Sequence, residues 1–166
     1  MFEDIRTIAV SVTSHIFETM FFTFLDPQGE GQEEEPSDFG SSSVFLKSEI
    51  GFVGKYSGKL ELSVPMGLAR TMVSNFIGLE EEEVLESQAV DMVSELCNMI
   101  CGNLSSQLDG KNAWDLTIPK TQPVPRQEIS DERKGPGITI DFDAEGQRVK
   151  LNIQFGPSGD LTQNQG

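Results

Sequence analysis

The segment from residue 81 to residue 108 contains no proline, and its apolar and polar residues separate onto two sides of a helix. The apolar residues follow one another at steps of four, four, three, four and four, which is helical spacing; they are Leu85, Ala89, Val93, Leu96, Ile100 and Leu104. A helix this long has to bury its apolar side against another layer of the protein. The sequence therefore predicts a long amphipathic helix lying on the body of the domain.

The other side of this helix carries a polar stripe. On a helical wheel of about 100° per residue, the stripe lies within roughly 80° of Glu95 and holds Gln88, Asp91, Glu95, Asn98, Gly102 and Ser105. Most exposed helix faces are simply solvated, and on spacing alone that alternative is as good as a functional one. The stripe has no Lys or Arg, however, so it lacks the ladder of opposite charges that supports a merely solvated helix.

Three further residues favour a contact surface on this face. Gly102 lies inside the helix, where glycine costs about 1 kcal/mol relative to alanine, and its missing side chain would let a bulky group approach. Met92 and Met99 flank the stripe, and methionine is common on adaptable contact surfaces, although both also suit the edge of a core. We expect Asp91, Met92, Met99 and Gly102 to contact a partner.

The rest of the chain alternates between strand and helix patterns. Leu60, Leu62 and Val64 alternate with polar residues, and the same period of two recurs near the C-terminus. We expect helices over 3–25, 66–77 and 81–108, and strands over 44–50, 55–64, 114–119, 138–142 and 149–155, with a turn at 51–54. Residues 20–25 would also suit a strand, and three prolines at 119, 123 and 125 are expected to break the chain. This order predicts an α+β fold, an antiparallel sheet packed against long helices.

The length of 166 residues suits one domain. We expect that domain to span 1–156, with an acidic flexible loop at about 29–43. The last residues, 157–166, are rich in Gly, Gln and Asn and are expected to form a disordered tail.

The charge balance excludes several classes of partner. With 12 basic and 27 acidic residues the net charge is -15, which repels nucleic acid and anionic membranes. No apolar run approaches the ~20 residues of a membrane span, and the start of the chain lacks the basic residues of a secretory signal. We expect a cytoplasmic protein that binds neither nucleic acid nor membrane.

The two cysteines, Cys97 and Cys101, are four residues apart on or near the buried side of the long helix. With His15 as the single histidine, they make a poor zinc site. We expect buried reduced thiols, which suit a reducing compartment, and neither a metal nor a cofactor belonging to the chain itself. We interpret His15 as an ordinary helix residue.

A constellation around the polar stripe resembles the CheC/CheX/FliY family of bacterial chemotaxis phosphatases, specifically its single-site CheX type. The family signature is an acidic or Ser residue, three residues, Glu, two residues, Asn and, roughly twenty residues later, a Pro. Here these are Asp91, Glu95, Asn98 and Pro119, and the surrounding sequences Asn-Met-Ile-x-Gly and Asp-Leu-Thr-Ile-Pro also match. The N-terminal helix offers only Glu18-Thr-Met-Phe21 in that register, so one site per chain is implied.

The resemblance implies an activity and a division of labour. Members of the family hydrolyse the aspartyl phosphate on a CheY-type receiver domain, and the receiver supplies the phosphorylated Asp and its Mg²⁺. By carry-over, Asn98 would hold the attacking water in line, and Glu95 would pair with the Lys of the receiver. An amide can both donate to and accept from a water, whereas a carboxylate at position 98 would repel the phosphoryl group.

The resemblance also implies a homodimer that forms through the sheets, and the alternating hairpin near the C-terminus offers an edge for it. Two other functions stay open at this point. The chain could be a non-catalytic adaptor that binds a receiver or a flagellar switch component through the same helix face. It could also be a structural domain with no partner at the stripe.

Overall fold

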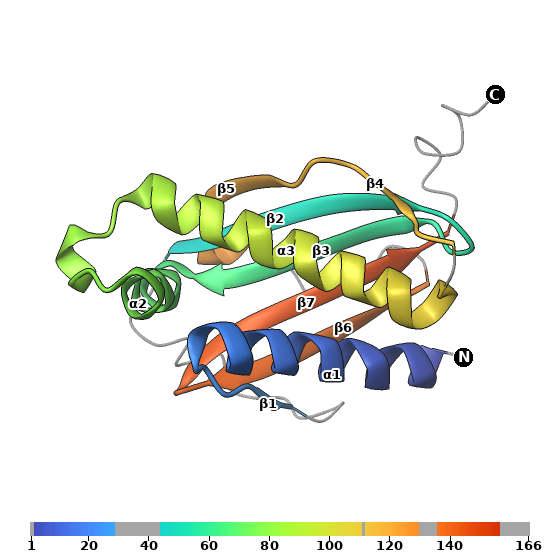
Figure 1. Cartoon of the computed structure of the whole chain (residues 1–166), viewed down its shortest axis with the longest axis horizontal. Helices are drawn as coiled ribbons and strands as arrows, with labels where there is room; N and C mark the ends of the chain where they lie inside the picture. The colour runs from blue at the N-terminus through green and yellow to red at the C-terminus, as the bar shows by residue number, and fades with distance from the viewer. Residues whose placement is uncertain (1, 29–43, 111, 130–135, 157–166) are drawn as a thin grey trace.

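The computed structural model describes residues 2–28, 44–110, 112–129 and 136–156. Within these residues the strands form one antiparallel sheet, and the three α-helices lie on one of its faces (Figure 1). The expected α+β architecture is confirmed. The expected acidic loop at 29–43 and the expected tail at 157–166 lie outside the described residues.

The helical elements are α1 (Phe2–Phe21), α2 (Met66–Ile77) and α3 (Glu86–Asp109), with short 3₁₀ turns η2 (Glu81–Glu83) and η3 (Arg126–Glu128). Helix α2 has the predicted bounds: it follows Pro65 and ends at Gly78, whose φ of 76° is the left-handed conformation that glycine adopts without strain. Helix α1 ends at Phe21, so residues 22–25 form neither the expected end of the helix nor the alternative strand.

The strands are β1 (Asp26–Pro27), β2 (Val44–Val53), β3 (Gly58–Pro65), β4 (Asp115–Leu116), β5 (Lys120–Pro125), β6 (Gly137–Ala144) and β7 (Gln147–Phe155). Their order across the sheet is β1-β6-β7-β3-β2-β4, and β5 also pairs with β2. In the C-terminal hairpin, β7 lies between β6 and β3, whereas β6 pairs on its other side with β1 over two residues, Phe142 and Asp143.

The period-two pattern decides which side chains meet the helices. In β3 and β7, Leu60, Leu62, Leu151 and Ile153 are almost completely buried and face the helix layer. They form one core cluster with the apolar side of α3, where Val93, Leu96, Ile100 and Leu104 are also buried. Burying a Leu, Ile or Val side chain contributes about 1.5–3 kcal/mol, so this interface fixes α3 on the sheet.

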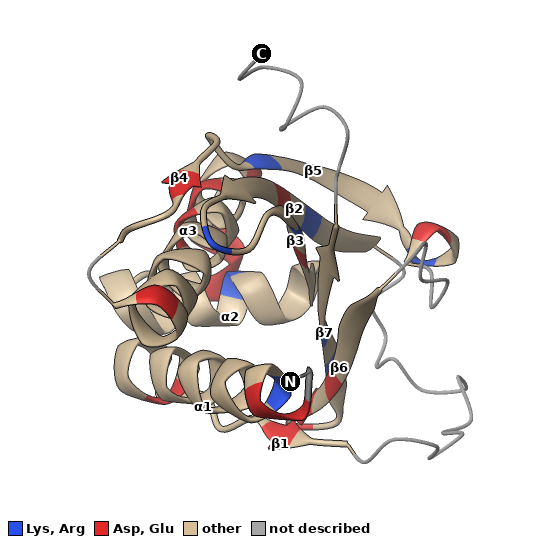
Figure 2. Ribbon diagram, turned by 90° about the vertical axis from the view of Figure 1, so that its right-hand side faces the viewer, with Lys and Arg blue, Asp and Glu red and all other residues tan. Residues whose placement is uncertain are grey.

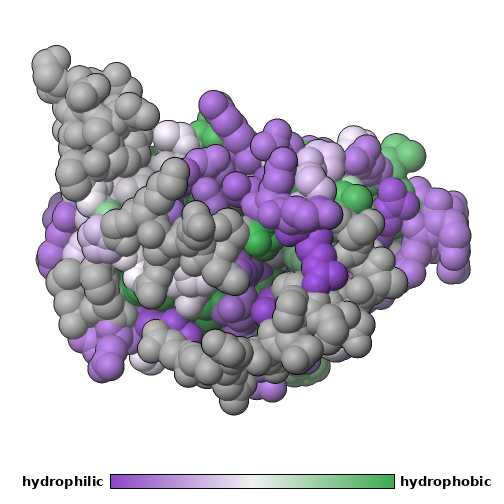
Figure 3. Space-filling model, turned by 180° about the vertical axis from the view of Figure 1, so that it is seen from behind, coloured by the Kyte–Doolittle hydropathy of each residue, from purple (hydrophilic) through white to green (hydrophobic). Residues whose placement is uncertain are grey.

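The opposite face of the sheet carries charged pairs. The ammonium group of Lys59 lies 2.7 Å from a carboxylate oxygen of Glu49 and 3.3 Å from one of Glu61, and Lys47 lies 3.8 Å from Glu61. Where described side chains are visible from behind, this face is mainly hydrophilic (Figure 3). Figure 2 shows that most of the described Lys and Arg residues lie on the strands, whereas Asp and Glu outnumber Lys and Arg on the helices.

Three expectations about strands were wrong. The predicted turn at 51–54 is not at that place, because β2 continues to Val53 and the chain turns only after it. The expected strand over 114–119 is reduced to the two residues of β4. The prolines at 123 and 125 do not break the chain, since they lie in β5, which among the described strands pairs with β2 alone. Such an edge strand tolerates proline where the backbone needs no donor.

The start of the long helix also differs from the prediction. The acidic run forms the separate turn η2, and α3 begins only at Glu86. The side-chain carbonyl of Gln88 accepts a hydrogen bond of 2.8 Å from the amide of Leu85, and this bond caps the start of α3. Leu85 is consequently 62% exposed and lies outside the apolar face.

Ser105 was expected in the polar stripe but is buried, and its hydroxyl accepts a hydrogen bond of 2.8 Å from the amide of Trp114.

Candidate functional site

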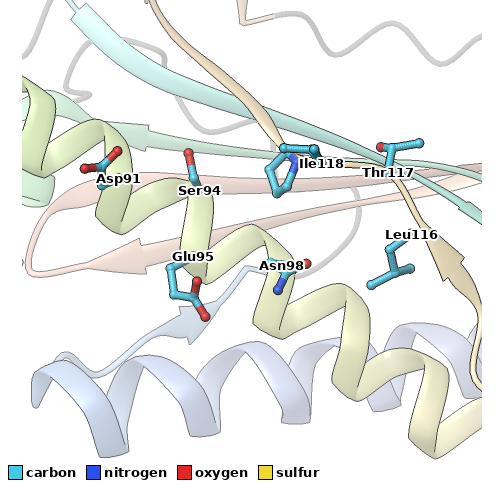
Figure 4. A pocket seen from close by; sticks show the side chains of 8 residues that line it. Asp91, Ser94, Glu95, Asn98, Leu116, Thr117 and Ile118 are labelled. Atoms are coloured by element: carbon cyan, nitrogen blue, oxygen red, sulfur yellow. The ribbon is translucent and has the colours of Figure 1, made fainter.

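An open groove of about 530 Å³ runs between α3 and the segment that enters β5. Helix α3 forms one wall, and residues 116–119 form the other (Figure 4). The lining residues are Asp91, Ser94, Glu95, Asn98, Leu116, Thr117, Ile118 and Pro119. The groove thus brings together all four residues of the signature, Asp91, Glu95, Asn98 and Pro119, from two separate parts of the chain.

The polar groups on the α3 wall are available to an outside molecule. Asp91, Glu95 and Asn98 are exposed, and within the described part of the chain no hydrogen bond or ion pair engages their side chains. Figure 4 shows Glu95 and Asn98 one helical turn apart on the wall of the groove. A carboxylate and an amide left unpaired at such spacing can accept and donate hydrogen bonds to a docked group.

The residues expected to flank this site have mixed environments. Met92 and Met99 are half-buried and pack against the core, so only part of each thioether side chain is available to a partner. A Cβ atom at Gly102 would have no atom within 4 Å apart from its own helix and chain neighbours. Packing within the described residues therefore does not require glycine there, and the surface beside it is open.

Two contacts hold the opposite wall. Thr117 pairs twice with Gly51 of β2: its amide donates to the Gly51 carbonyl over 2.9 Å, and its hydroxyl accepts from the Gly51 amide over 2.8 Å. Just before this segment, the indole of Trp114 stacks on Phe52 with ring centroids 4.8 Å apart. Ile118, between the anchored Thr117 and Pro119, is left 86% exposed at the lip of the groove.

A chain of hydroxyl groups joins the two walls beneath the groove. The hydroxyl oxygens of Ser94 and Thr121 are 2.6 Å apart, and the Thr121 hydroxyl donates to that of Ser48 over 2.8 Å. Ser94 belongs to α3, Thr121 to β5 and the fully buried Ser48 to β2. These bonds set the spacing between the helix that carries Glu95 and Asn98 and the strand that follows Pro119.

The two cysteines lie on the far side of α3 from the groove, and both are free thiols in the core. Burial raises the pKa of Cys97 to about 12, against a smaller lowering by the side chain of Ser48, and the thiol also donates to the Ser48 carbonyl over 3.7 Å. Burial likewise raises the pKa of Cys101 to about 12. Since the thiolate is the reactive form, neither cysteine is an effective nucleophile near neutral pH.

The described residues contain neither a metal-binding cluster of side chains nor a membrane-spanning helix. No group of three or more His, Cys, Asp or Glu side chains in this part of the chain is arranged to hold a metal ion. None of the described helices combines the length and apolar character needed to cross a bilayer. His15 is an exposed residue of α1, away from the groove lining.

Sequence reasoning missed half of the groove. Ser94, Leu116, Thr117 and Ile118 line it together with the predicted residues. The signal for three of them was present, because Leu116, Thr117 and Ile118 belong to the Asp-Leu-Thr-Ile-Pro match, of which only Pro119 was assigned to the signature. Ser94 had no signal of its own, because its place depends on the packing of α3 against β5.

Solved structures share this fold. CheX from Vibrio vulnificus has 21% sequence identity and a TM-score of 0.73, and the match covers 92% of this chain and 97% of that one. CheX from Desulfovibrio desulfuricans has 18% identity and a TM-score of 0.71, covering 92% and 99%. A complex of CheX with CheY, BeF₃ and Mg²⁺ from Borrelia burgdorferi matches at 16% identity and a TM-score of 0.68, covering 92% and 97%.

The fold is therefore that of the CheX and CheC-like chemotaxis proteins. The family model described as chemotaxis phosphatase CheX matches residues 48–143, more than half of the chain. The chain belongs to the CheX family of chemotaxis phosphatases. The comparison with curated proteins found no match.

Proposed function

We propose that this protein stimulates hydrolysis of the aspartyl phosphate on a CheY-type receiver domain in chemotaxis or related two-component signalling. The observation that carries the proposal is the groove in which the exposed Glu95 and Asn98 lie opposite Pro119. Membership of the CheX family and the CheX–CheY complex among the structural relatives support it.

In this mechanism the chain adds an amide and a carboxylate to an active site that the receiver already holds. Asn98 orients a water for in-line attack on the phosphorus, and Glu95 pairs with a receiver lysine and so fixes the docked geometry. Phosphoryl transfer is accelerated mainly by positioning and electrostatics. The Mg²⁺ and the phosphorylated aspartate belong to the receiver, which is the substrate.

Partner contacts follow from the same geometry. Asp91, Met92, Met99 and Gly102 surround Glu95 and Asn98 on α3 and would meet the receiver surface. The open space beside Gly102 and the half-exposed thioethers support this role. The protein would work in the cytoplasm with its receiver, and the homodimer implied by the family resemblance stays a prediction.

The test is the decay of a phosphorylated receiver from the same cell with catalytic amounts of this protein. Decay should accelerate, and Asn98→Ala should lower the accelerated rate at least about 100-fold, as expected for loss of a positioned hydrogen-bonding group. Glu95→Ala should mainly weaken receiver binding. Because both side chains point outward, both variants should melt at the temperature of the unmodified protein.

Asn103→Ala is the matched control, since Asn103 is an exposed amide on the same helix but donates to the carbonyl of Met99 and does not line the groove. This variant should retain full activity. Receiver binding without any accelerated decay, in the presence of an intact fold, would reject the phosphatase and support the adaptor that uses the same helix face.

A further inference from the structure

Large apolar side chains gather at the end of the helix layer where α1 and α2 finish. Phe22 and Phe24 directly follow α1 and are 76% and 66% exposed, and Phe76 and Ile77 close α2 and are 53% and 46% exposed. The two helix ends adjoin, because the rings of Phe21 and Phe76 make an edge-to-face contact with centroids 5.7 Å apart. We call Phe22, Phe24, Phe76 and Ile77 the α1–α2 end patch. Exposed apolar groups in such a cluster mark contact surfaces.

The backbone at Phe22 argues that its ring serves a contact outside the chain. The amides of Phe22 and Thr23 donate to the carbonyls of Glu18 and Phe17, each over 3.1 Å, which is a helix stop usually built on glycine. Phe22 has the left-handed φ of 54° that the stop requires, and this conformation is unfavourable for a residue with a side chain. Thr23 turns into the core, whereas the Phe22 ring remains in solvent.

The charges around the patch select the kind of partner. Helices α1 and α2 both end here, and the last turn of each helix contains neither Lys nor Arg. Their C-terminal ends therefore present uncompensated negative dipoles. Glu18 precedes the patch in α1, and η2 follows α2 with Glu81, Glu82 and Glu83, all exposed. Glu81 accepts a hydrogen bond from the hydroxyl of Thr71, which ties this acidic turn to α2.

The combination of exposed apolar side chains with surrounding negative charge disfavours two kinds of binding partner and favours a third. A second copy of the chain would bring the same carboxylates to the contact, and an anionic lipid surface would be repelled by them. A segment with an apolar face flanked by Lys or Arg fits both the aromatic side chains and the negative rim. We propose that the α1–α2 end patch docks a cationic amphipathic helix of a partner protein.

The patch is separate from the groove. The groove lies along the middle of α3 and the segment 116–119, whereas α1 and α2 end at the left of the helix layer in Figure 1. None of the residues of the patch lines the groove. Both surfaces are thus open at once, so a bound helix at the patch would tether the protein without blocking the groove.

The experiment uses two synthetic helices, one with Leu on one face and Lys on the other, and a counterpart with Glu in place of Lys. Amide chemical shifts of the ¹⁵N-labelled full chain are followed during titration with each. The Lys helix should shift amides at and around the patch and leave those of the groove unchanged, and the Glu helix should shift none. The double variant Phe22→Asn/Phe24→Ser should bind the Lys helix about tenfold more weakly, a loss of about 1.4 kcal/mol.

Two controls separate docking from folding. Ile118→Ser removes an even more exposed apolar side chain elsewhere and should bind the Lys helix as the unmodified protein does. Phe22→Asn should not lower the melting temperature, because asparagine tolerates the left-handed conformation. A lowered melting temperature would assign Phe22 to the fold. Unchanged affinity in the double variant, binding to anionic vesicles, or self-association lost in the double variant would each overturn the proposal.

Discussion

At the scale of single residues, exposure separates the groups that hold the fold from those that can meet a partner. Ile118 is the most exposed large apolar side chain of the described residues, yet its neighbours on both sides are held in the groove wall. The bonds between Thr117 and Gly51 leave this segment little freedom. An exposed apolar side chain on a rigid segment beside polar groups, such as Ile118, is typical of the few residues that contribute most of the binding free energy at an interface.

We therefore expect Ile118→Ser to raise the KM for the phosphorylated receiver about tenfold and to leave kcat unchanged. Stability should change by less than about 0.5 kcal/mol, since the side chain is in solvent. Steady-state kinetics over a range of receiver concentrations, together with a thermal melt, measure both. A fall in kcat at an unchanged KM would mean that Ile118 acts on the reacting groups and not on docking.

At the scale of elements, the sequence predicted the helices whose bounds depend on local residues, and it missed the strand whose formation depends on pairing with a distant strand. The bounds of α2 were predicted because Pro65 and Gly78 mark them directly. Helical spacing predicted the site helix and its polar stripe, and the family resemblance selected Asp91, Glu95 and Asn98 from that stripe. Strand β5 was missed because proline is a poor residue inside a sheet, and only its place beside β2 shows that the lost donors are tolerated there.

The hydroxyl chain makes the groove dependent on how α3, β5 and β2 pack together. Thr121→Val removes the middle hydroxyl and leaves that of the buried Ser48 without this partner. We expect the free energy of unfolding to fall by about 1–3 kcal/mol, the cost of an unsatisfied buried polar group. Activity should also fall, because the wall that carries Pro119 loses its connection to Ser94.

Chemical denaturation and receiver decay assays test this expectation. Gln122→Ala is the control, since Gln122 is the exposed neighbour of Thr121 on the same strand; it should change neither quantity. Full activity together with full stability in Thr121→Val would show that the hydroxyl chain does not set the distance between the walls.

At the scale of the whole molecule, the core holds two protonated thiols, so stability should depend on pH at the alkaline end. Cys97 and Cys101 have pKa values of about 12 in the folded protein against 9.0 for an exposed thiol. A group whose folded pKa is raised contributes stability that is complete below its unfolded pKa and is lost as pH rises toward the folded value. Stability should therefore decline from about pH 9 toward pH 12.

Unfolding measured at a series of alkaline pH values tests this decline. The variant Cys97→Ala/Cys101→Ala should lose less stability between neutral and alkaline pH than the unmodified protein does, whatever its stability at neutral pH. A thiol reagent adds a second measurement: near neutral pH the native protein should react slowly at both cysteines, and the unfolded protein rapidly. Rapid modification of the folded chain would contradict the burial of the thiols.

Helix α3 places its core residues and its proposed recognition residues on opposite sides. Its apolar residues pack against the sheet beneath them. Asp91, Glu95 and Asn98 are exposed and do not contribute to the core, and the space beside Gly102 is open. Substitutions on the outer side thus escape the constraint that stability places on most positions. A duplicated copy of such a protein is able to acquire a different partner by changing a handful of outward residues, with its fold inherited intact.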